Sequence, residues 1–329
     1  MTITVAMYDK GHQHIGQRLA ALGLDIKLAT FSKDGTMSID GAAIAPREAD
    51  IDYLWLNSSI NADGFQDGAF ALAQACRSVK VLQTYNAGLD HPFYKAMAAK
   101  GTRICNSSAQ AIAISEFVLA HVMSVVHPID QQRELQARKQ WKITPYREIS
   151  QTNWLIVGFG PIGQEIARKV KVFGARTAIV RRSPTVSELA DKVGTMTELK
   201  AFAAEADVIV LACSLNAQTR GLADAAFFGA VKPGAILANI ARGALIDDTA
   251  LLAALDKGTL AHAVLDVFHQ EPLPADNPFW SHPKVRMTSH TSFAGSGVRG
   301  RWDALFLDNI ARFVNGKPLV NEVDPNDLA

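Results

Sequence analysis

Short apolar runs alternate along the whole chain with longer segments in which apolar residues recur at helical spacing. Each run has the length of a buried strand. Strands are predicted at residues 3–7, 25–30, 51–56, 79–84, 153–158, 177–180, 207–212, 235–240, 261–267 and 285–289. Strands that alternate with helices are typical of βαβ crossovers, so this pattern predicts parallel sheets with helices on both faces.

Two passages rich in turn-forming or small residues, at residues 101–110 and near residue 290, divide this pattern. A chain of 329 residues also predicts two domains at about 150 residues each. The last segment, residues 298–316, is predicted to form an amphipathic helix that returns to the first domain, because five of its apolar residues share one helical face: Trp302, Leu305, Phe306, Ile310 and Phe313. We therefore predict an α/β protein with two doubly wound, Rossmann-like or flavodoxin-like domains, one of residues 1–101 plus 292–329 and one of residues 102–291.

Composition and charge narrow the classes of partner. The chain has 33 Lys plus Arg against 32 Asp plus Glu, so it lacks the basic surplus expected of a nucleic-acid or anionic-membrane face. It begins without a basic and then apolar leader, and no apolar stretch reaches the roughly 18 residues of a membrane span. We expect a soluble, cytoplasmic protein. Its three cysteines, Cys76, Cys105 and Cys213, are too few and too far apart to predict a disulfide framework or a metal site.

Residues 153–174 carry a glycine motif between a predicted strand and a predicted helix. The helix is predicted to end at Gly174 and to place four residues on one face: Ile162, Ile166, Val170 and Phe173. Gly158, Gly160 and Gly163 have the G-x-G-x-x-G spacing. In a dinucleotide site the first glycine makes a tight turn, the second lets a pyrophosphate approach the backbone, and the third allows close packing of helix and strand. The helix start attracts phosphates through its amides and dipole. The motif predicts a cofactor site at residues 158–163, namely Gly158, Phe159, Gly160, Pro161, Ile162 and Gly163; a bare structural turn is the alternative.

The residues after the next strand favour NADP(H) over NAD(H). An NAD site would place an acidic residue there for the ribose 2′-hydroxyl. The chain instead has Arg181, Arg182 and Ser183. Guanidinium groups bind phosphate bidentately and serine adds a donor, so these residues suit a 2′-phosphate. The alternative is a solvated arginine pair at a strand end.

Two further stretches, residues 231–255 and 261–290, complete an ordered set of motifs with NAGLD at residues 86–90. With these motifs the sequence resembles the D-isomer-specific 2-hydroxyacid dehydrogenases, which include glyoxylate and hydroxypyruvate reductases and D-lactate, D-glycerate and D-3-phosphoglycerate dehydrogenases. The resemblance covers nearly the whole chain. It implies a homodimer and an active-site cleft between two domains.

The resemblance also implies roles for single residues. Arg242 would bind the substrate, and Glu271 would pair with His290, the general acid and base, which would also contact substrate and cofactor. Asp266 would meet the nicotinamide carboxamide, and the amides of Ala87 and Gly88 would receive the substrate carboxylate. Further cofactor contacts fall on residues after two of the predicted strands: Cys213, Ser214, Leu215, Thr219, Ile240 and Ala241. No metal is implied.

The chemistry of these residues fits the reduction of a 2-oxo acid. The carbonyl oxygen must receive a proton, and histidine is the natural donor near neutral pH. A neighbouring carboxylate orients the imidazole and favours its protonated form. Arg242 can bind both the carboxylate and the carbonyl oxygen. His269 and His282 are the nearest competitors of His290, but only His290 closes a predicted strand, where open α/β sheets bind ligands.

We therefore predict NADPH-dependent reduction of a small 2-oxo acid, such as glyoxylate or hydroxypyruvate, to a D-2-hydroxy acid. Two alternatives remain: a dinucleotide-sensing regulator without turnover, and a formate- or phosphite-type dehydrogenase. Ser289 stands where many members of the family have proline, so substrate preference stays open. Residues 54–59 and Phe293 are candidates for contacting the far end of the substrate.

Two features of residues 111–141 bear on assembly. The apolar helix predicted at residues 111–126 is either a dimer interface or a buried helix between domains. Trp141 either packs in a core or reaches the active site of a partner subunit, and we expect core packing.

Overall fold

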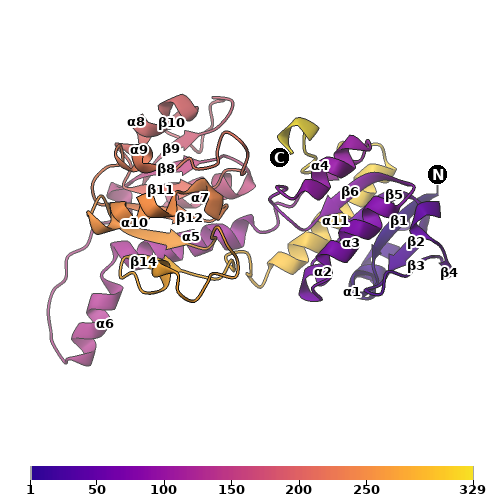
Figure 1. The fold of residues 1–329 in the computed structure, drawn as a ribbon, viewed down its shortest axis with the longest axis horizontal. Coiled ribbons are helices and arrows are strands. Elements are labelled where there is room, and N and C mark those ends of the chain that lie inside the picture. The colour runs from indigo at the N-terminus through magenta and orange to yellow at the C-terminus, as the bar shows by residue number, and fades with distance from the viewer. Residues whose placement is uncertain (1, 329) are drawn as a thin grey trace. The chain divides into compact units, whose positions relative to one another are not determined.

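The computed structural model describes residues 2–328 and divides into two compact units, shown as ribbons in Figure 1. Unit 1 is Met1–Ala109 with Ser296–Ala329, and unit 2 is Gln110–Gly295. The first crossing lies after Ala109, whereas we placed it after residue 101. The cause is local: residues 103–105 form a strand of unit 1, and the carbonyl of Ala109 accepts a hydrogen bond from Arg301 Nε at 2.8 Å.

Unit 1 is built on a seven-stranded sheet in the order β4-β3-β2-β1-β5-β6-β7, in which all pairs are parallel except β2 with β3 and β3 with β4. The parallel part has the flavodoxin-like strand order. Its strands are β1 Ile3–Tyr8, β2 Ile26–Phe31, β3 Met37–Ile39, β4 Ala42–Ala43, β5 Asp50–Leu56, β6 Ser78–Thr84 and β7 Arg103–Cys105. Its helices are α1 Asp9–Ala20, α2 Ser59–Ala62, α3 Gln66–Ala75, α4 Pro92–Ala99 and α11 Val298–Val314.

Successive residues of these strands enter different cores, because strand side chains alternate between the two faces of a sheet. Ala6 and Tyr8 of β1 belong to the core that includes residues of α3 and α4. Val5 and Met7 belong to the core that includes residues of α1 and α11. Phe306 of α11 stacks on Trp55 of β5 with ring centroids 4.2 Å apart. The C-terminal helix is therefore part of unit 1.

Unit 2 is built on a second seven-stranded sheet, parallel throughout, in the order β10-β9-β8-β11-β12-β13-β14. This is the Rossmann order with one further strand at the β14 edge. Its strands are β8 Asn153–Val157, β9 Arg176–Val180, β10 Lys192–Gly194, β11 Val208–Leu211, β12 Ala235–Asn239, β13 Leu260–Leu265 and β14 Val285–Met287. Its helices are α5 Ala111–Val126, α6 Ile129–Ala137, α7 Pro161–Val172, α8 Leu199–Ala203, α9 Ala225–Phe228 and α10 Asp248–Asp256.

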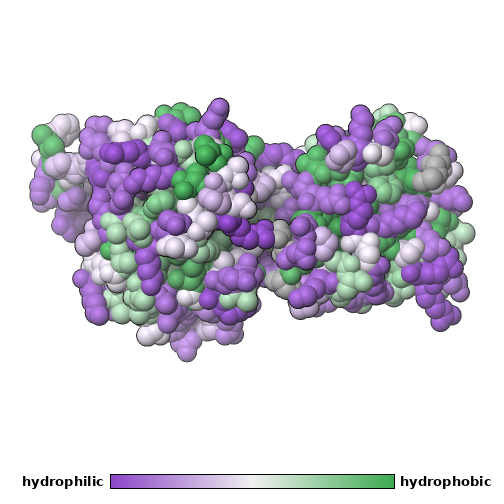
Figure 2. Space-filling model, turned by 90° about the horizontal axis from the view of Figure 1, so that it is seen from above, coloured by the Kyte–Doolittle hydropathy of each residue, from purple (hydrophilic) through white to green (hydrophobic). Residues whose placement is uncertain are grey.

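Helices cover both faces of this sheet too. Leu155 and Val157 of β8 pack in one core with residues of α8, α9 and α10, and Trp154 and Ile156 pack in the other with α5 and α7. In the face of each unit seen in Figure 2, hydrophilic residues cover most of the surface and hydrophobic ones are interspersed. The predicted fold class, two Rossmann-like parallel-sheet α/β domains, is confirmed.

The predicted helix at residues 111–126 is present as α5, which packs against α7 in unit 2. Its buried residues include Ile114, Val118 and Val122. In the described part of the chain, no single helix is long and apolar enough to cross a membrane; by length and composition, only α5 and α6 taken together would be, and they are bent by 56° relative to each other.

Two sequence expectations about aromatic residues are wrong. Trp141 is not in a core: its exposed fraction is 103%, and among residues 138–148 only Thr144 is buried, because no strand or helix forms there. Phe173 was expected on the buried face of the glycine-motif helix, but α7 ends at Val172 and Phe173 is exposed. Gly174, with a φ of +80°, ends that helix as expected.

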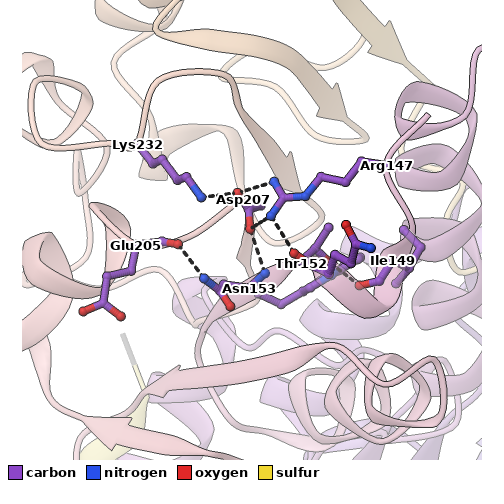
Figure 3. A network of polar contacts seen from close by, with 9 residues as sticks. Arg147, Ile149, Thr152, Asn153, Glu205, Asp207 and Lys232 are labelled. Atoms are coloured by element: carbon purple, nitrogen blue, oxygen red, sulfur yellow. Dashed lines mark hydrogen bonds and ion pairs between the residues drawn. The ribbon is translucent and has the colours of Figure 1, made fainter. Parts of the chain in front are cut away.

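A polar network fixes the amino ends of β8 and β11, as Figure 3 shows. Asp207, 7% exposed, accepts hydrogen bonds from both terminal nitrogens of Arg147, at 2.7 and 2.9 Å, from Lys232, and from the backbone amide of Asn153 at 2.9 Å. Burial by itself raises the pKa of Asp207, but these hydrogen bonds outweigh it and hold that pKa below its usual range. The network joins the segment before β8 to the sheet.

Candidate active site

The predicted site residues of unit 2 lie on loops that leave one edge of its sheet. Because every strand is parallel, the loops after the strands all start at the carboxyl-terminal edge, where open α/β sheets bind ligands. These loops carry Gly158 after β8, Arg181 after β9, Cys213 after β11, Arg242 after β12, Asp266 after β13 and His290 after β14.

The glycine motif has the geometry that a phosphate loop needs. Gly158 has a φ of +101°, a left-handed region that favours glycine, and an added Cβ would lie 2.6 Å from the backbone of Ala212. At Gly163 an added Cβ would lie 2.2 Å from the carbonyl oxygen of Gly158. Gly160 precedes α7 and has no described atom within 4 Å of that position, and no side chain caps the helix start. The loop is therefore closely packed around Gly158 and Gly163 and open at Gly160.

The three residues predicted to bind the 2′-phosphate of the ribose lie just after β9. Arg181 is fixed by its backbone amide, which donates to Gly194 O of β10 at 3.0 Å. Its guanidinium lies over the ring of Phe159, 5.6 Å from the centroid. Arg182 and Ser183 are exposed. The structure thus brings a cation to the glycine loop through Phe159.

The loop after β11 lies against the glycine motif, because the Cα of Cys213 would be 2.6 Å from a Cβ at Gly158. Burial raises the pKa of the Cys213 thiol to about 11, which makes it a poor nucleophile at neutral pH. Ser214 is exposed and Leu215 is partly buried. Thr219 closes the loop: its hydroxyl donates to Ser214 O at 2.7 Å and accepts from Asn216 N at 2.9 Å.

Arg242 lies in the turn after β12, between Ile240 and Ala241 on one side and the 3₁₀ turn Gly243–Leu245 on the other. Asn239, fully buried at the end of β12, was not predicted from the sequence. Its Oδ1 accepts from Ala241 N at 3.1 Å and its Nδ2 donates to Arg242 O at 2.9 Å. A single polar residue inside the otherwise apolar run 235–240 was the available signal.

Glu271 and His290 form a pair, as the resemblance implied. His290 Nδ1 lies 2.7 Å from Glu271 Oε2, and Glu271 Oε1 accepts from the backbone amide of Phe268 at 2.9 Å. Both side chains are partly exposed, at 42% for His290 and 37% for Glu271. The Nε2 atom of His290 therefore remains the ring nitrogen for a ligand.

The surroundings of Glu271 stabilise its ionised form. Partial burial by itself raises the pKa of Glu271, but the hydrogen bonds from His290 and Phe268 outweigh it and the charge of Arg242 adds to their effect, so that pKa is lower than usual. Gly243, next to Arg242, packs so closely on the backbone of Phe268 that an added Cβ would lie 2.0 Å from its carbonyl carbon. The arginine turn and the glutamate loop are thus in direct contact.

The competing histidines have other partners. His269 Nε2 lies 2.8 Å from Ile246 O, and His282 Nε2 lies 3.4 Å from the carboxylate of Asp256. Neither pairs with Glu271. Phe293, three residues after His290, packs with its ring nearly perpendicular to the imidazole, at a centroid distance of 6.4 Å.

Asp266 is buried completely, with an exposed fraction of 0%. Its carboxylate accepts hydrogen bonds from Thr288, Thr291 and Ser292, all on the segment that carries His290. Its contact with the nicotinamide stays a prediction.

Ala87 and Gly88 belong to unit 1 and follow β6. The loop is fixed by Asn106 Nδ2, which donates to Ala87 O at 2.8 Å, and by Ser107 N, which donates to Asn86 O at 2.9 Å. Within residues 2–328, the backbone amides of Ala87 and Gly88 donate to no protein acceptor. They are therefore available as donors to a ligand.

Comparisons with known proteins point to one family. The family model described as the NAD binding domain of D-isomer specific 2-hydroxyacid dehydrogenases matches residues 119–292. Human glyoxylate reductase/hydroxypyruvate reductase is 28% identical over 261 residues, which cover 77% of this chain and 79% of that protein.

This chain is also similar to solved structures over its full length. A D-isomer specific 2-hydroxyacid dehydrogenase from Xanthobacter autotrophicus Py2, in complex with NADPH and MES, has a TM-score of 0.78 and 26% identity and covers 100% of both chains. The NADPH-dependent glyoxylate/hydroxypyruvate reductase from Sinorhizobium meliloti, in complex with NADP and sulfate, has a TM-score of 0.77 and 25% identity, again with 100% of both chains covered.

Proposed function

Because the chain belongs to the D-isomer-specific 2-hydroxyacid dehydrogenases, a family of NAD(P)-binding oxidoreductases, we propose that it reduces small 2-oxo acids such as glyoxylate or hydroxypyruvate to D-2-hydroxy acids with NADPH. The observation that carries this proposal is the pairing of His290 with Glu271 at 2.7 Å, on the sheet edge that also holds the glycine loop and Arg242. A sensor of dinucleotides without turnover would not need this pair.

The residues present fit a dinucleotide phosphate. The open space at Gly160 and the uncapped start of α7 suit a pyrophosphate, and Arg181, Arg182 and Ser183 suit the 2′-phosphate. We assign the further cofactor contacts to the loops after β11 and β12, at Ser214, Leu215, Ile240 and Ala241. A bound NADPH would supply the hydride that reduces the carbonyl carbon.

The chain itself would supply the proton and hold the substrate. His290, oriented through Nδ1 by Glu271, donates the proton from Nε2 to the carbonyl oxygen, and takes it back in the reverse reaction. Arg242 binds the substrate carboxylate and stabilises negative charge on the carbonyl oxygen. The amides of Ala87 and Gly88 would also bind the carboxylate.

A substrate panel tests the activity directly. Purified protein is incubated with NADPH and, in separate reactions, glyoxylate, hydroxypyruvate and pyruvate, and the loss of NADPH absorbance is followed. We expect turnover with glyoxylate or hydroxypyruvate, and D-glycerate as the product from hydroxypyruvate on chiral chromatography. Turnover of formate or phosphite with NADP but of no 2-oxo acid would replace this proposal, and so would cofactor binding without any turnover.

Cofactor preference is tested by Arg181→Asp. A charge-assisted hydrogen bond contributes about 1.5–3 kcal/mol. We therefore expect the ratio of kcat/KM with NADPH to that with NADH to fall by about 10- to 100-fold. Arg176→Asp, at the opposite end of β9, is the matched control and should leave the ratio unchanged. An unchanged ratio in Arg181→Asp would overturn the assignment.

We also propose a homodimer, as the family resemblance implies. The segment between α6 and β8 exposes three large hydrophobic side chains, and the two most exposed are Trp141 at 103% and Ile143 at 87%. We expect the double variant Trp141→Asp/Ile143→Asp to have the mass of a monomer in light scattering. Val172→Asp changes a similarly exposed residue of α7 and should leave the mass of the wild type. A monomeric wild type would contradict this proposal. The cytoplasmic location stays a prediction.

A further inference from the structure

Asp266 directly follows β13, at the sheet edge of the proposed active site. Its carboxylate accepts hydrogen bonds from the segment that carries His290. We propose that Asp266 is a positioning residue whose buried carboxylate fixes the turn at His290, so that the imidazole faces Glu271 in one orientation. The kinetic part of this inference rests on the proposed function, whereas the structural part does not.

Three hydrogen bonds join the Asp266 carboxylate to the segment around His290. Oδ1 accepts from Thr288 Oγ1 at 2.7 Å and from the backbone amide of Thr291 at 2.8 Å. Oδ2 accepts from the backbone amide of Ser292 at 3.0 Å. The donors lie on both sides of His290 in the chain. Both oxygens of the carboxylate are thus engaged, as a buried charge requires.

The backbone of His290 needs such support. Its φ is +50°, in the left-handed region that a residue other than glycine seldom adopts. A conformation of this kind costs free energy and persists only where the surroundings determine it. The amide of His290 itself donates to the carbonyl oxygen of Asp266 at 2.8 Å. Main chain and side chain of one residue therefore hold the turn.

The position of the turn decides where the imidazole points. His290 Nδ1 meets Glu271 Oε2 at 2.7 Å, and Glu271 is fixed in turn by the amide of Phe268, two residues after Asp266. The partners of the proton-transfer pair are thus both held from the end of β13. A misplacement of about 1 Å in such a site can lower the rate by about 100-fold.

This role differs from the contact with the nicotinamide carboxamide that the resemblance implies. The Asp266 side chain has an exposed fraction of 0% and bonds the loop of His290 through both oxygens, so the positioning role holds whether or not the carboxamide is also bound. The two roles predict different consequences when Asp266 is replaced by the isosteric asparagine. The amide nitrogen would face a donor of the loop, so at least one of the three hydrogen bonds is lost.

The test compares Asp266→Asn with Asp207→Asn in the full-length protein. Asp207 is a matched control, because it is a buried carboxylate of the same sheet that accepts several hydrogen bonds at the opposite edge. Long-range ¹⁵N spectra of histidine-labelled protein report the tautomer of each ring, and the spectrum of His290→Asn assigns the signal of His290. We expect one fixed His290 tautomer in the wild type and in Asp207→Asn, and averaging of both tautomers in Asp266→Asn.

Kinetics and cofactor binding give a second readout. We expect kcat of Asp266→Asn with saturating NADPH to fall by about 100-fold, and the Kd for NADPH reports separately on a contact with the carboxamide. Thr288→Val removes one donor and keeps the charge, so an intermediate loss of kcat is expected even where Asp266→Asn fails to fold.

Two results would overturn the proposal. One is a fixed His290 tautomer in Asp266→Asn together with the rate of the wild type. The other is a fixed His290 tautomer together with a loss of rate that a weaker affinity for NADPH fully explains, since that would assign Asp266 to the cofactor and not to the turn. A wild type without turnover would end the proposed function, but the tautomer of His290 would still decide this inference.

Discussion

Among single residues, the proposed proton transfer depends on the pair of His290 and Glu271. The two residues come from loops after different strands, yet their atoms meet at 2.7 Å. Glu271 is held ionised by His290, by the amide of Phe268 and by the charge of Arg242, against the effect of burial. Because that pKa lies below its usual range, the carboxylate keeps its charge, and with it the pair, at neutral pH and moderately below.

Glu271→Gln tests this pair. The glutamine keeps the shape but removes the charge that orients and stabilises a protonated imidazole, so we expect kcat to fall by about 100-fold. The Kd for NADPH should not change, because Glu271 is not itself among the predicted cofactor contacts. Asp256→Asn, which alters the carboxylate near His282, is the control and should keep the rate of the wild type. A Glu271→Gln enzyme with normal kcat would remove the glutamate from the mechanism.

At the scale of elements, the glycine loop separates packing from binding. Gly163 is surrounded, with the carbonyl of Gly158 at 2.2 Å from an added Cβ, whereas the same position at Gly160 is open. Gly160 has no left-handed φ, so alanine is compatible with its backbone. This difference agrees with the separate tasks that the motif implies, packing at Gly163 and room for a ligand at Gly160.

Gly160→Ala and Gly163→Ala are therefore a matched pair. We expect Gly163→Ala to lower the free energy of unfolding by about 1–3 kcal/mol, because α7 must move away from the Gly158 turn. Gly160→Ala should unfold at the same urea concentration as the wild type but bind NADPH at least about tenfold more weakly. Equal stability losses in both variants would contradict the assignment of Gly160 to the pyrophosphate.

The Asp207 network is a second element-scale feature, and its pH dependence has a definite sign. The pKa of Asp207 is lowered in the folded protein, so its contribution to stability is present above the unfolded carboxyl pKa of about 3.9 and is lost as the pH falls through the lower folded value. We expect Asp207→Asn to cost about 2 kcal/mol at neutral pH, measured by urea unfolding.

The exposed pair of Glu205 and Lys192 is the control for this network. Both side chains are more than half exposed, so Glu205→Gln should change the free energy of unfolding by less than about 0.5 kcal/mol. The difference between wild type and Asp207→Asn should shrink as the pH is lowered below about 4. A difference that stays constant to lower pH would contradict the ionised network.

At the scale of the whole molecule, the sequence predicts the two sheets well and their short strands poorly. The ten apolar runs all appear as strands, but β3, β4, β7 and β10 were not predicted. Each of these has two or three residues, too few for a period of two to show, and pairing with a neighbouring strand creates them. Phe173 and Trp141 were misplaced because an apolar side chain does not by itself show whether a neighbour covers it.

The residues of the candidate site also differ in how well the sequence predicts them. Residues recognised by their motifs, such as Gly158, Arg242 and His290, lie on the expected loops of one sheet edge. The hydrogen bonds that hold these loops could not be predicted from the sequence. Asn239 bonds the turn of Arg242 and Asp266 bonds the turn of His290, and both contacts exist only once the sheet has formed. The net charge of +1 does not reveal this site, since a few well-placed cations can bind small anions in a protein whose total charge is near zero.

In the proposed reaction, His290 supplies the proton when NADPH reduces a 2-oxo acid. The most direct measurement is a single turnover with excess enzyme, NADPH and glyoxylate or hydroxypyruvate, comparing wild type, His290→Ala and the control His282→Ala. We predict that His290→Ala, with saturating NADPH, consumes the cofactor at least about 100-fold more slowly, while His282→Ala matches the wild type. Consumption of NADPH by His290→Ala at the rate of the wild type would contradict this role of His290.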